Sequence, residues 1–469
     1  MSCLWLRWLG TQAEVLRNYS FGHGGDEEIL GFAQQDELSR TYGEEGEDLG
    51  EEERGSPCRK TGAAQQIASP KITTWEAAWN VTNAIQGIFV LGLPYALLQS
   101  GYLGLLLLVL AAVLCSYTGK ILIACLYEDS EDGTQVRVRN TYEDIANACC
   151  AHLCPRLGGK IINAAQVVEL MMTCVLYLVV SSNLACHSFP FIPLSSTAWS
   201  VATFLTLVPC MLIRDLRVVS RLSLLCSVAQ FLITAIVIVY CLTQAQRWSW
   251  RRTPLPVDFE KLLVSVGVII FSYTSQIFLP TLEGSMADRA GFAGMVTWTH
   301  ALACVFKTAF SLLAFLTWGE ETKEVITDNL PPTLRVAVNL FLLAKALLSY
   351  PLPFYAAAEV LQGCVGQCGA AWIEAREGAL VLRAGLLLLT FLAAMYMPHF
   401  SLLMGLTGSM TGAAMTLLLP SLFHLQLKWR KMDTKFKALD FVILVLGSLC
   451  SLSGVIYSVK GMSKAFGGR

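Results

Sequence analysis

The residues best suited to chemistry are four charged side chains within apolar stretches. Glu169 lies in INAAQVVELMMTCVLYLVV, and Lys307, Lys345 and Glu359 lie in later apolar runs. A charge inside a bilayer is expensive unless it is neutralised or paired, so such residues often mark ion or proton pathways. We interpret Glu169 as the candidate proton-coupling group. The alternative is a carboxyl group that only hydrogen-bonds to a neighbouring helix or pairs with a buried lysine.

The two lysines each need a counter-charge or carbonyl oxygens. They could take the place of a bound sodium ion, or they could pair with Glu169 or Glu359, and we favour a structural ion pair for both. No metal site is predicted, because the cysteines outside apolar runs lack CxxC spacing and nearby histidine pairs. Most of the sixteen cysteines lie in apolar runs, so we expect no disulfide framework.

Two uncharged stretches combine membrane-spanning length with helix-breaking residues. In the first, residues 79–98, the helix is interrupted by Asn80, Thr82, Asn83, Gln86, Gly87, Gly92 and Pro94. Lipid offers no hydrogen-bond partners, so backbone freed at such a break must face the protein interior. The amides of a half-helix would suit an anionic group there. The alternative is a kink that only packs against neighbouring helices.

The second stretch, residues 262–284, repeats this plan with a polar cluster followed by Pro280 and Gly284. The cluster consists of Ser272, Tyr273, Thr274, Ser275 and Gln276. Counted along the chain, the two stretches are helices 1 and 6, so each opens a group of five helices. Interrupted helices at corresponding positions are typical of an inverted repeat with a binding site at its interface.

The composition places these elements in a polytopic membrane protein. Apolar and aromatic residues make up 54% of the 469 positions and charged residues 15%. We predict an all-α fold of eleven transmembrane helices, with broken helices 1 and 6 in two groups of five and one extra helix. The predicted spans are 77–98, 102–127, 161–184, 197–213, 222–244, 262–284, 295–318, 334–361, 379–397, 400–424 and 437–459.

The distribution of charge and the grouping of the predicted helices define the predicted domains and their orientation. Residues 1–71 form an acidic, disordered tail, because residues 1–70 hold thirteen Asp and Glu against six Lys and Arg. The two five-helix groups occupy 72–244 and 245–427, and 428–469 form the eleventh helix and the end of the chain. The excess of Lys and Arg in alternate loops predicts a cytosolic amino terminus and a carboxyl terminus on the opposite side.

No catalytic or nucleotide-binding pattern occurs. The motifs GxxxxGK[ST], HExxH and GxSxG are absent from the sequence, so we expect neither an enzyme nor an ATP-driven pump. We expect no organic cofactor and no nucleic-acid partner. The expected surroundings are the lipid bilayer.

Five strings closely resemble the vesicular inhibitory amino acid transporters, or vesicular GABA transporters, of the amino acid/auxin permease group. They are WNVTNAIQGIFVLGLPY (79–95), FSYTSQIFLP (271–280), TKEVITDNLP (322–331), AKALLSYPLPF (344–354) and PHFSLLMGLTGS (398–409). The resemblance covers roughly residues 72–460 and departs in the amino-terminal tail and around 362–380. It implies ten core helices in a LeuT-type inverted repeat plus an eleventh helix, in a transporter of this group or a divergent paralogue.

The resemblance also implies a function: secondary active loading of GABA and glycine from cytosol into synaptic vesicles. The driving force would be the proton electrochemical gradient made by a separate vacuolar proton ATPase, through proton exchange or chloride cotransport. The carboxyl terminus would then be lumenal. The alternatives are a plasma-membrane or lysosomal neutral amino acid permease of the same group, or a channel or sensor that binds amino acids without moving them.

A small zwitterionic amino acid needs both of its ends held and its chain covered. We expect its carboxylate to meet the break amides of Gln86, Gly87 and Ile88, in a pocket shaped by Thr82 and Asn83. Carbonyl and hydroxyl groups near Ser272, Thr274 and Ser275 would hold its ammonium group. Tyr273 and Tyr177 are the candidate walls.

Overall fold

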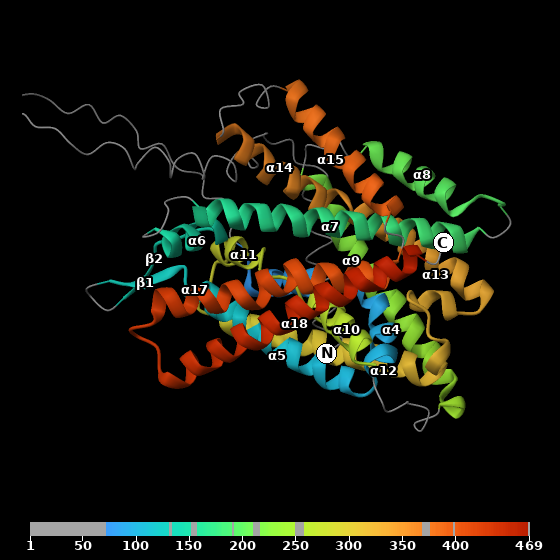
Figure 1. Cartoon of the computed structure of the whole chain (residues 1–469), viewed down its shortest axis with the longest axis horizontal. Helices are drawn as coiled ribbons and strands as arrows, with labels where there is room; N and C mark the ends of the chain where they lie inside the picture. Colours follow the sequence, from blue (N-terminus) through green and yellow to red (C-terminus); the bar gives the residue numbers. More distant parts are fainter. Residues whose placement is uncertain are drawn as a thin grey trace, which may run out of the picture. The chain divides into compact units, whose positions relative to one another are not determined.

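The computed structural model describes residues 72–130, 134–151, 157–189, 192–209, 216–248, 258–367, 376–396 and 399–467 (Figure 1). Within these ranges the chain consists of helices, one short β-hairpin and the segments that connect these elements, which confirms the predicted all-α class. The tail predicted for residues 1–71 lies outside the described residues. The division at residues 244 and 427 stays a prediction.

The first half of the chain begins with an interrupted helix and continues with helices of unequal length. Its elements are α3 (Thr74–Ile85), the 3-10 helix η1 (Ile88–Gly92), α4 (Leu93–Ser100), α5 (Leu103–Ala124), β1 (Tyr127–Asp129), β2 (Gln135–Arg137), α6 (Tyr142–Cys150), α7 (Leu157–Ser188), α8 (Ser196–Leu207) and α9 (Leu216–Thr243). A short 3-10 helix, η3 (Ala245–Arg247), follows.

The second half again begins with an interrupted helix. Its elements are α10 (Phe259–Ser272), α11 (Leu279–Ser285), α12 (Phe292–Trp318), η4 (Gly319–Glu321), η5 (Ile326–Asn329), α13 (Pro332–Ser349), α14 (Pro351–Gln367), α15 (Arg376–Tyr396), α16 (Phe400–Thr407), the π-helical turns η7 (Gly408–Gly412) and η8 (Ala414–Leu418), α17 (Leu419–Lys428) and α18 (Thr434–Gly467).

Seven helical segments of the described chain are long and apolar enough to cross a membrane. They are Leu103–Ala124, Leu157–Ser188, Phe292–Glu321, Pro332–Val365, Gly378–Tyr396, Phe400–Lys428 and Thr434–Ala465. The interrupted helices fall outside this group because each half is short. Two shorter apolar helical segments are Ile88–Ser100, in the first interrupted helix, and Val228–Thr243, in α9. The predicted total of eleven crossings stays a prediction.

Both predicted interruptions are present, and proline explains where the helices resume. The chain leaves α3 at Gln86 and passes through extended Gly87 into η1, and Pro94 then lies in the first turn of α4. Pro280 holds the same place in α11. Proline lacks an N–H and has a helical φ, so it suits a first turn and disrupts a helix interior.

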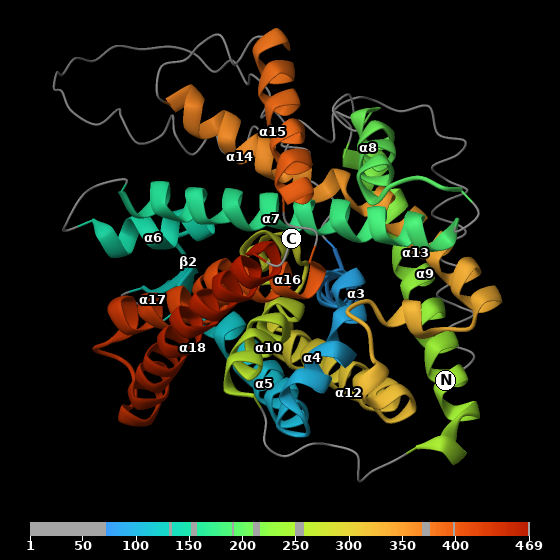
Figure 2. The same cartoon turned by 45° about the vertical axis from the view of Figure 1, so that its right-hand side comes forward.

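The interrupted helices pack together with the helices that follow them. Helix α4 packs on α10, α5 contacts α10 and α11, and α12 contacts α3 and α4. This reciprocal pattern is what two related repeats produce. Figures 1 and 2 show this group on one side of the long α7, with α8, α14 and α15 on the other.

Glycine allows α10 to touch the chain around α16 backbone to backbone. A Cβ atom added to Gly408 would lie 1.9 Å from the carbonyl oxygen of Gly267, and one added to Gly267 would lie 2.3 Å from that of Gly405. Real side chains never approach backbone so closely, so these positions exclude every larger residue. The small residues at 405–412 thus permit close helix packing.

The last helix, α18, is held by one fully buried carboxyl group. Asp440 accepts a hydrogen bond from the hydroxyl of Tyr117 on α5 at 2.6 Å. Nδ1 of His424 on α17 lies 2.6 Å from its other oxygen. The carboxyl group therefore joins three helices at one point.

Candidate functional site

The first break presents donor groups beside Gly87. Gln86 closes α3 by donating its N–H to the carbonyl of Thr82 at 2.8 Å. Its side chain is buried, yet its Nε2 has no hydrogen-bond partner within the described residues. The 3-10 helix that follows leaves its first N–H groups without intrahelical acceptors, and these include Ile88. Unpaired donors therefore gather at this break.

The other residues predicted to form the first break are Ile88, Thr82 and Asn83. The side chain of Ile88 is fully buried in the apolar core, so only its backbone can serve a ligand. Thr82 is buried in α3. Asn83 lies in α3 as well, but its side chain lies outside the described residues.

The second break is a tightly bonded turn between α10 and α11. Tyr273 and Thr274 donate their N–H groups to Ile270 and Phe271 at 2.9 and 3.2 Å. Gln276 fixes the turn to α5, because its Nε2 donates to the carbonyl of Cys115 at 3.2 Å and to Oγ1 of Thr118 at 3.3 Å. The turn therefore has a defined position against α5.

Lys307 on α12 occupies the position that we predicted for the ammonium group of a substrate. Its Nζ donates to the carbonyl oxygen of Ser272 and, at 3.2 Å, to Oγ of the same residue. The ammonium group also lies 3.8 Å from the ring centroid of Tyr273. A cation at a helix C-terminus is favourable because it meets the negative end of the dipole. Lys307 thus caps α10 at the break.

This contact corrects two predictions. Within the described residues Lys307 has no carboxylate partner, so its predicted pairing with Glu169 or Glu359 is wrong. The freed carbonyl of Ser272 supplies the oxygen instead, which a sequence cannot show. Tyr273 is fully buried, with His300 stacked at 6.5 Å between ring centroids and Lys307 nearby, so it faces α12 and is not an accessible wall.

The remaining hydroxyl groups of the second break are only partly engaged. Oγ of Ser272 donates to the carbonyl of Ile269 at 2.8 Å, and Oγ1 of Thr274 donates to that of Phe271 at 2.9 Å. The hydroxyl of Ser275 is buried and has no partner in the part of the chain that the structure describes. Among the predicted serines and threonine, Ser275 is the one that keeps its hydroxyl free.

The two breaks meet through the rings of Phe89 and Phe271, which the sequence analysis did not single out. Phe89 of η1 lies 4.9 Å from Phe271 of α10 and 5.3 Å from Tyr177 of α7, measured between ring centroids. Phe89 and Tyr177 are partly buried, whereas Phe271 is buried. Tyr177 therefore does lie beside the first break, and its role as a wall stays a prediction.

Glu169 is buried in α7. Its backbone carbonyl accepts from Thr173 at 2.8 Å, but its Oε2 has no partner and no cation lies within 4.0 Å among the described residues. An unpaired carboxyl group in such surroundings is least costly when protonated. Burial raises the pKa of Tyr142 on α6 well above its usual range.

The other two candidate charges differ in burial. Lys345 is buried and donates to Oε1 of Gln230 on α9 at 2.6 Å. Glu359 is exposed, so its predicted burial is wrong, and its role as a charge partner stays a prediction. The predicted span 334–361 consists of two helices, α13 and α14, which meet at Tyr350.

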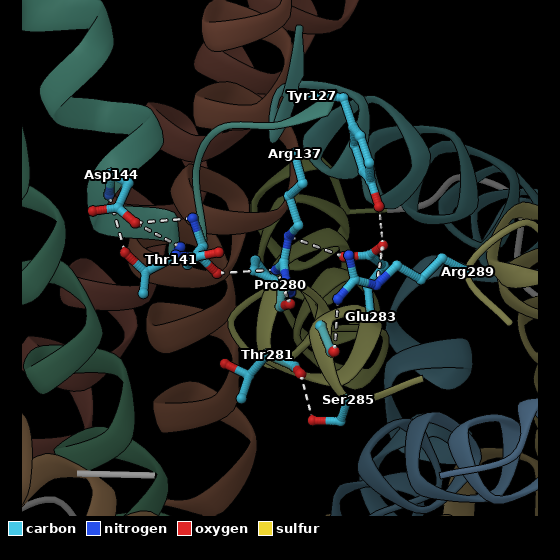
Figure 3. Close-up of polar contacts among 11 residues, drawn as sticks. Tyr127, Arg137, Thr141, Asp144, Pro280, Thr281, Glu283, Ser285 and Arg289 are labelled. Atoms are coloured by element: carbon cyan, nitrogen blue, oxygen red, sulfur yellow. Dashed lines mark hydrogen bonds and ion pairs between the residues drawn. The ribbon is translucent and has the colours of Figure 1, made fainter. Parts of the chain in front are cut away.

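A second polar cluster, which the sequence analysis missed, surrounds Glu283 at the end of α11 (Figure 3). This carboxyl group is buried and accepts a hydrogen bond from the hydroxyl of Tyr127 on β1. Nε of Arg137 on β2 lies 3.4 Å from it and Nε of Arg289 lies 3.8 Å from it. Arg137 also donates to the carbonyl of Pro280 at 2.9 Å. The cluster fastens α11 to the β-hairpin.

Backbone pairing links the same end of α11 to the start of α3. Ile72 donates its N–H to the carbonyl of Ser285 at 2.9 Å, and Ala287 donates to the carbonyl of Ile72 at the same distance. Burial lowers the pKa of Arg137, and the charge of Glu283 opposes that shift. The entrance to the first interrupted helix and the exit from the second are thus held together.

Two interrupted helices that meet within a helical membrane protein define a class: proteins that bind small polar solutes at mid-membrane depth. The chain belongs to the transmembrane amino acid transporter protein family, which matches residues 70–460. It is therefore an amino acid transporter and not an enzyme.

Relatives cover nearly the whole chain. A vesicular inhibitory amino acid transporter from Xenopus tropicalis is 51% identical over 97% of this chain and 95% of its own length. The Homo sapiens protein of that name is 50% identical over 94% and 92%. A vesicular GABA transporter from Caenorhabditis elegans is 38% identical over 85% and 82%.

A solved manganese transporter from Eremococcus coleocola superposes with a TM-score of 0.49 at 14% identity, covering 86% of this chain and 89% of its own. The family assignment rests on the sequence relatives.

Proposed function

We propose that this chain loads inhibitory amino acids, GABA and glycine, from the cytosol into synaptic vesicles. The supporting observation is that the relatives at about half identity over nearly full length are vesicular inhibitory amino acid transporters. The proton electrochemical gradient of a separate vacuolar ATPase drives the transport, by proton exchange or chloride cotransport. In this proposal the amino terminus is cytosolic and the carboxyl terminus lumenal.

The first break receives the substrate carboxylate. Amides at Gly87 and Ile88 stand at the start of η1, and the buried Nε2 of Gln86 lacks a partner. A buried donor without an acceptor costs free energy, roughly 1–3 kcal/mol, and a bound carboxylate would remove that cost. Thr82 and Asn83, one turn earlier on α3, shape this side of the site.

The second break receives the substrate ammonium group through Ser275 rather than Ser272. The carbonyl of Ser272 already accepts from Lys307, so it is not open to a second cation. The hydroxyl of Ser275 is unpaired, and Thr274 beside it is only partly buried. Tyr177 covers the chain between the two ends of the substrate.

The gradient is large enough for the task. One pH unit supplies about 1.4 kcal/mol per exchanged proton. Each net charge that crosses adds about 2.3 kcal/mol per 100 mV. Since about 1.4 kcal/mol corresponds to a tenfold concentration ratio, either component concentrates an amino acid several-fold.

Uptake by proteoliposomes containing the full chain tests the proposal. Labelled GABA and glycine should accumulate when pH, voltage or chloride gradients are imposed separately, and the three arms identify the coupling ions. Saturable accumulation of both is the expected result. Binding without gradient-dependent accumulation would point to a sensor, and localisation of a tagged chain away from a vesicle marker would point to a plasma-membrane or lysosomal permease.

Replacing Glu169 with glutamine should abolish uptake driven by pH while leaving exchange of labelled for unlabelled substrate. The amide keeps the size of the side chain but cannot take up or release a proton. Glu320→Gln, at an exposed position in η4, is the control and should behave as wild type. Unchanged pH-driven uptake by the Glu169 variant would exclude this residue as the coupling group.

A further inference from the structure

Phe89, at the first break, contacts two other helices with one ring. It lies two residues after Gly87, in the 3-10 segment that opens the second half of the interrupted helix. Its ring makes edge or tilted contacts with Phe271 and Tyr177, at interplanar angles of 62° and 53°. These are the geometries that aromatic pairs prefer. One ring therefore touches α10 and α7 at once, and its orientation is fixed from two sides.

The same ring covers Gly87. A Cβ atom added to Gly87 would lie 3.5 and 3.9 Å from two ring carbons of Phe89, which is ordinary van der Waals contact. Gly87 and Phe89 are both partly buried, whereas Phe271 behind the ring is buried. Phe89 therefore stands at the accessible edge of the break. A ring that served only to fill the core would be enclosed as Phe271 is.

We propose that Phe89 is a specificity-determining residue that rejects amino acids carrying a side chain on the carbon next to the carboxylate. The inference rests on the proposed function, in which the carboxylate binds the amides of Gly87 and Ile88. The carbon next to that carboxylate then lies within van der Waals reach of the ring. A methyl or larger substituent on this carbon meets the ring of Phe89.

This geometry selects substrates by whether the carbon next to the carboxylate carries a side chain, and not by the length of the molecule. In glycine and in GABA the carbon next to the carboxylate carries two hydrogens and no side chain, although GABA is longer by two methylene groups. Alanine and valine carry substituents at that carbon. Steric exclusion by a fixed ring accounts for a preference shared by two substrates of different length. Pocket contacts of this kind discriminate by roughly 10- to 200-fold per methylene group.

Competitive uptake by proteoliposomes containing the full chain tests this inference. Initial rates for glycine and GABA are compared with those for alanine and valine, in wild type, Phe89→Ala and Phe89→Leu. The control is Phe441→Ala, because Phe441 lies on α18, outside both breaks, and is 63% exposed. We expect wild type and the control to prefer glycine over alanine at least tenfold. In Phe89→Ala this preference should fall at least tenfold, and in Phe89→Leu by a smaller factor.

The outcomes separate the inference from the function on which it rests. If wild type accumulates neither glycine nor GABA, the proposed function fails and the inference fails with it. If wild type transports both and the Phe89 variants keep the wild-type preference, the inference alone is overturned. Phe89→Leu retains most of the side-chain volume, so it decides the question if Phe89→Ala does not fold.

Discussion

Replacing Lys307 with methionine should reduce transport at least a hundredfold while the protein still folds. Methionine fills a similar volume, and removing a buried charge also removes its desolvation cost, so the fold is not expected to collapse. The carbonyl and hydroxyl oxygens of Ser272, however, lose their cation. Because those oxygens set the geometry where α10 ends, the second break should no longer hold a substrate. Uptake and thermal stability, measured on the same purified protein, check both parts.

The matched control for this variant is Lys261→Met. Lys261 lies on α10 itself, but its side chain is 60% exposed and its ion pair with Asp258 spans 4.0 Å. Exposed pairs of this kind contribute little to stability, roughly 0–1 kcal/mol. Wild-type uptake by the Lys307 variant would contradict a capping role for this residue.

The second large effect is expected from Glu283→Gln, which should lower both the melting temperature and the uptake rate, the latter at least tenfold. Arg137 has a side chain that is only 12% exposed, so without the carboxylate it becomes a largely buried and unpaired cation. Breaking a buried pair in this way costs up to about 3–5 kcal/mol, and less here because Arg289 is 40% exposed. Thermal unfolding in detergent and uptake in proteoliposomes measure the two effects.

Glu128→Gln separates this effect from a general loss of charge. Glu128 lies on the same hairpin and pairs with Arg139, but its side chain is 55% exposed. We expect nearly wild-type stability and uptake from it. Equal losses in the two variants would show that the hairpin, and not the carboxyl group of Glu283, is responsible.

The interruptions of the two helices were predictable because their causes are local. Gly87, Pro94 and Pro280 act through their own backbone preferences, and lipid cannot offset the hydrogen bonds that they disrupt. The same holds for the small residues at 405–412, where missing side chains permit close approach. Such features depend on a few neighbouring residues and not on how the chain folds back on itself.

The partners of the charged groups were not predictable, because they depend on contacts between distant segments. Lys307 meets Ser272 from 35 residues away, and Tyr127 meets Glu283 from 156 residues away. Nothing in the run around Glu283 indicates that two arginines lie opposite. Glu359 is a further case, because the apolar run around it predicts burial whereas its side chain is exposed.

The glycine contact between α10 and the chain around α16 also bears on motion. With the backbones of Gly267 and Gly408 in close contact, α10 cannot slide along its neighbour without a clash between main chains. The end of α11 has other partners, because Glu283 joins it to the β-hairpin and Ile72 joins it to the start of α3. A displacement of α10 relative to α11 would therefore have to be taken up by residues 273–278, beside the ammonium group of Lys307.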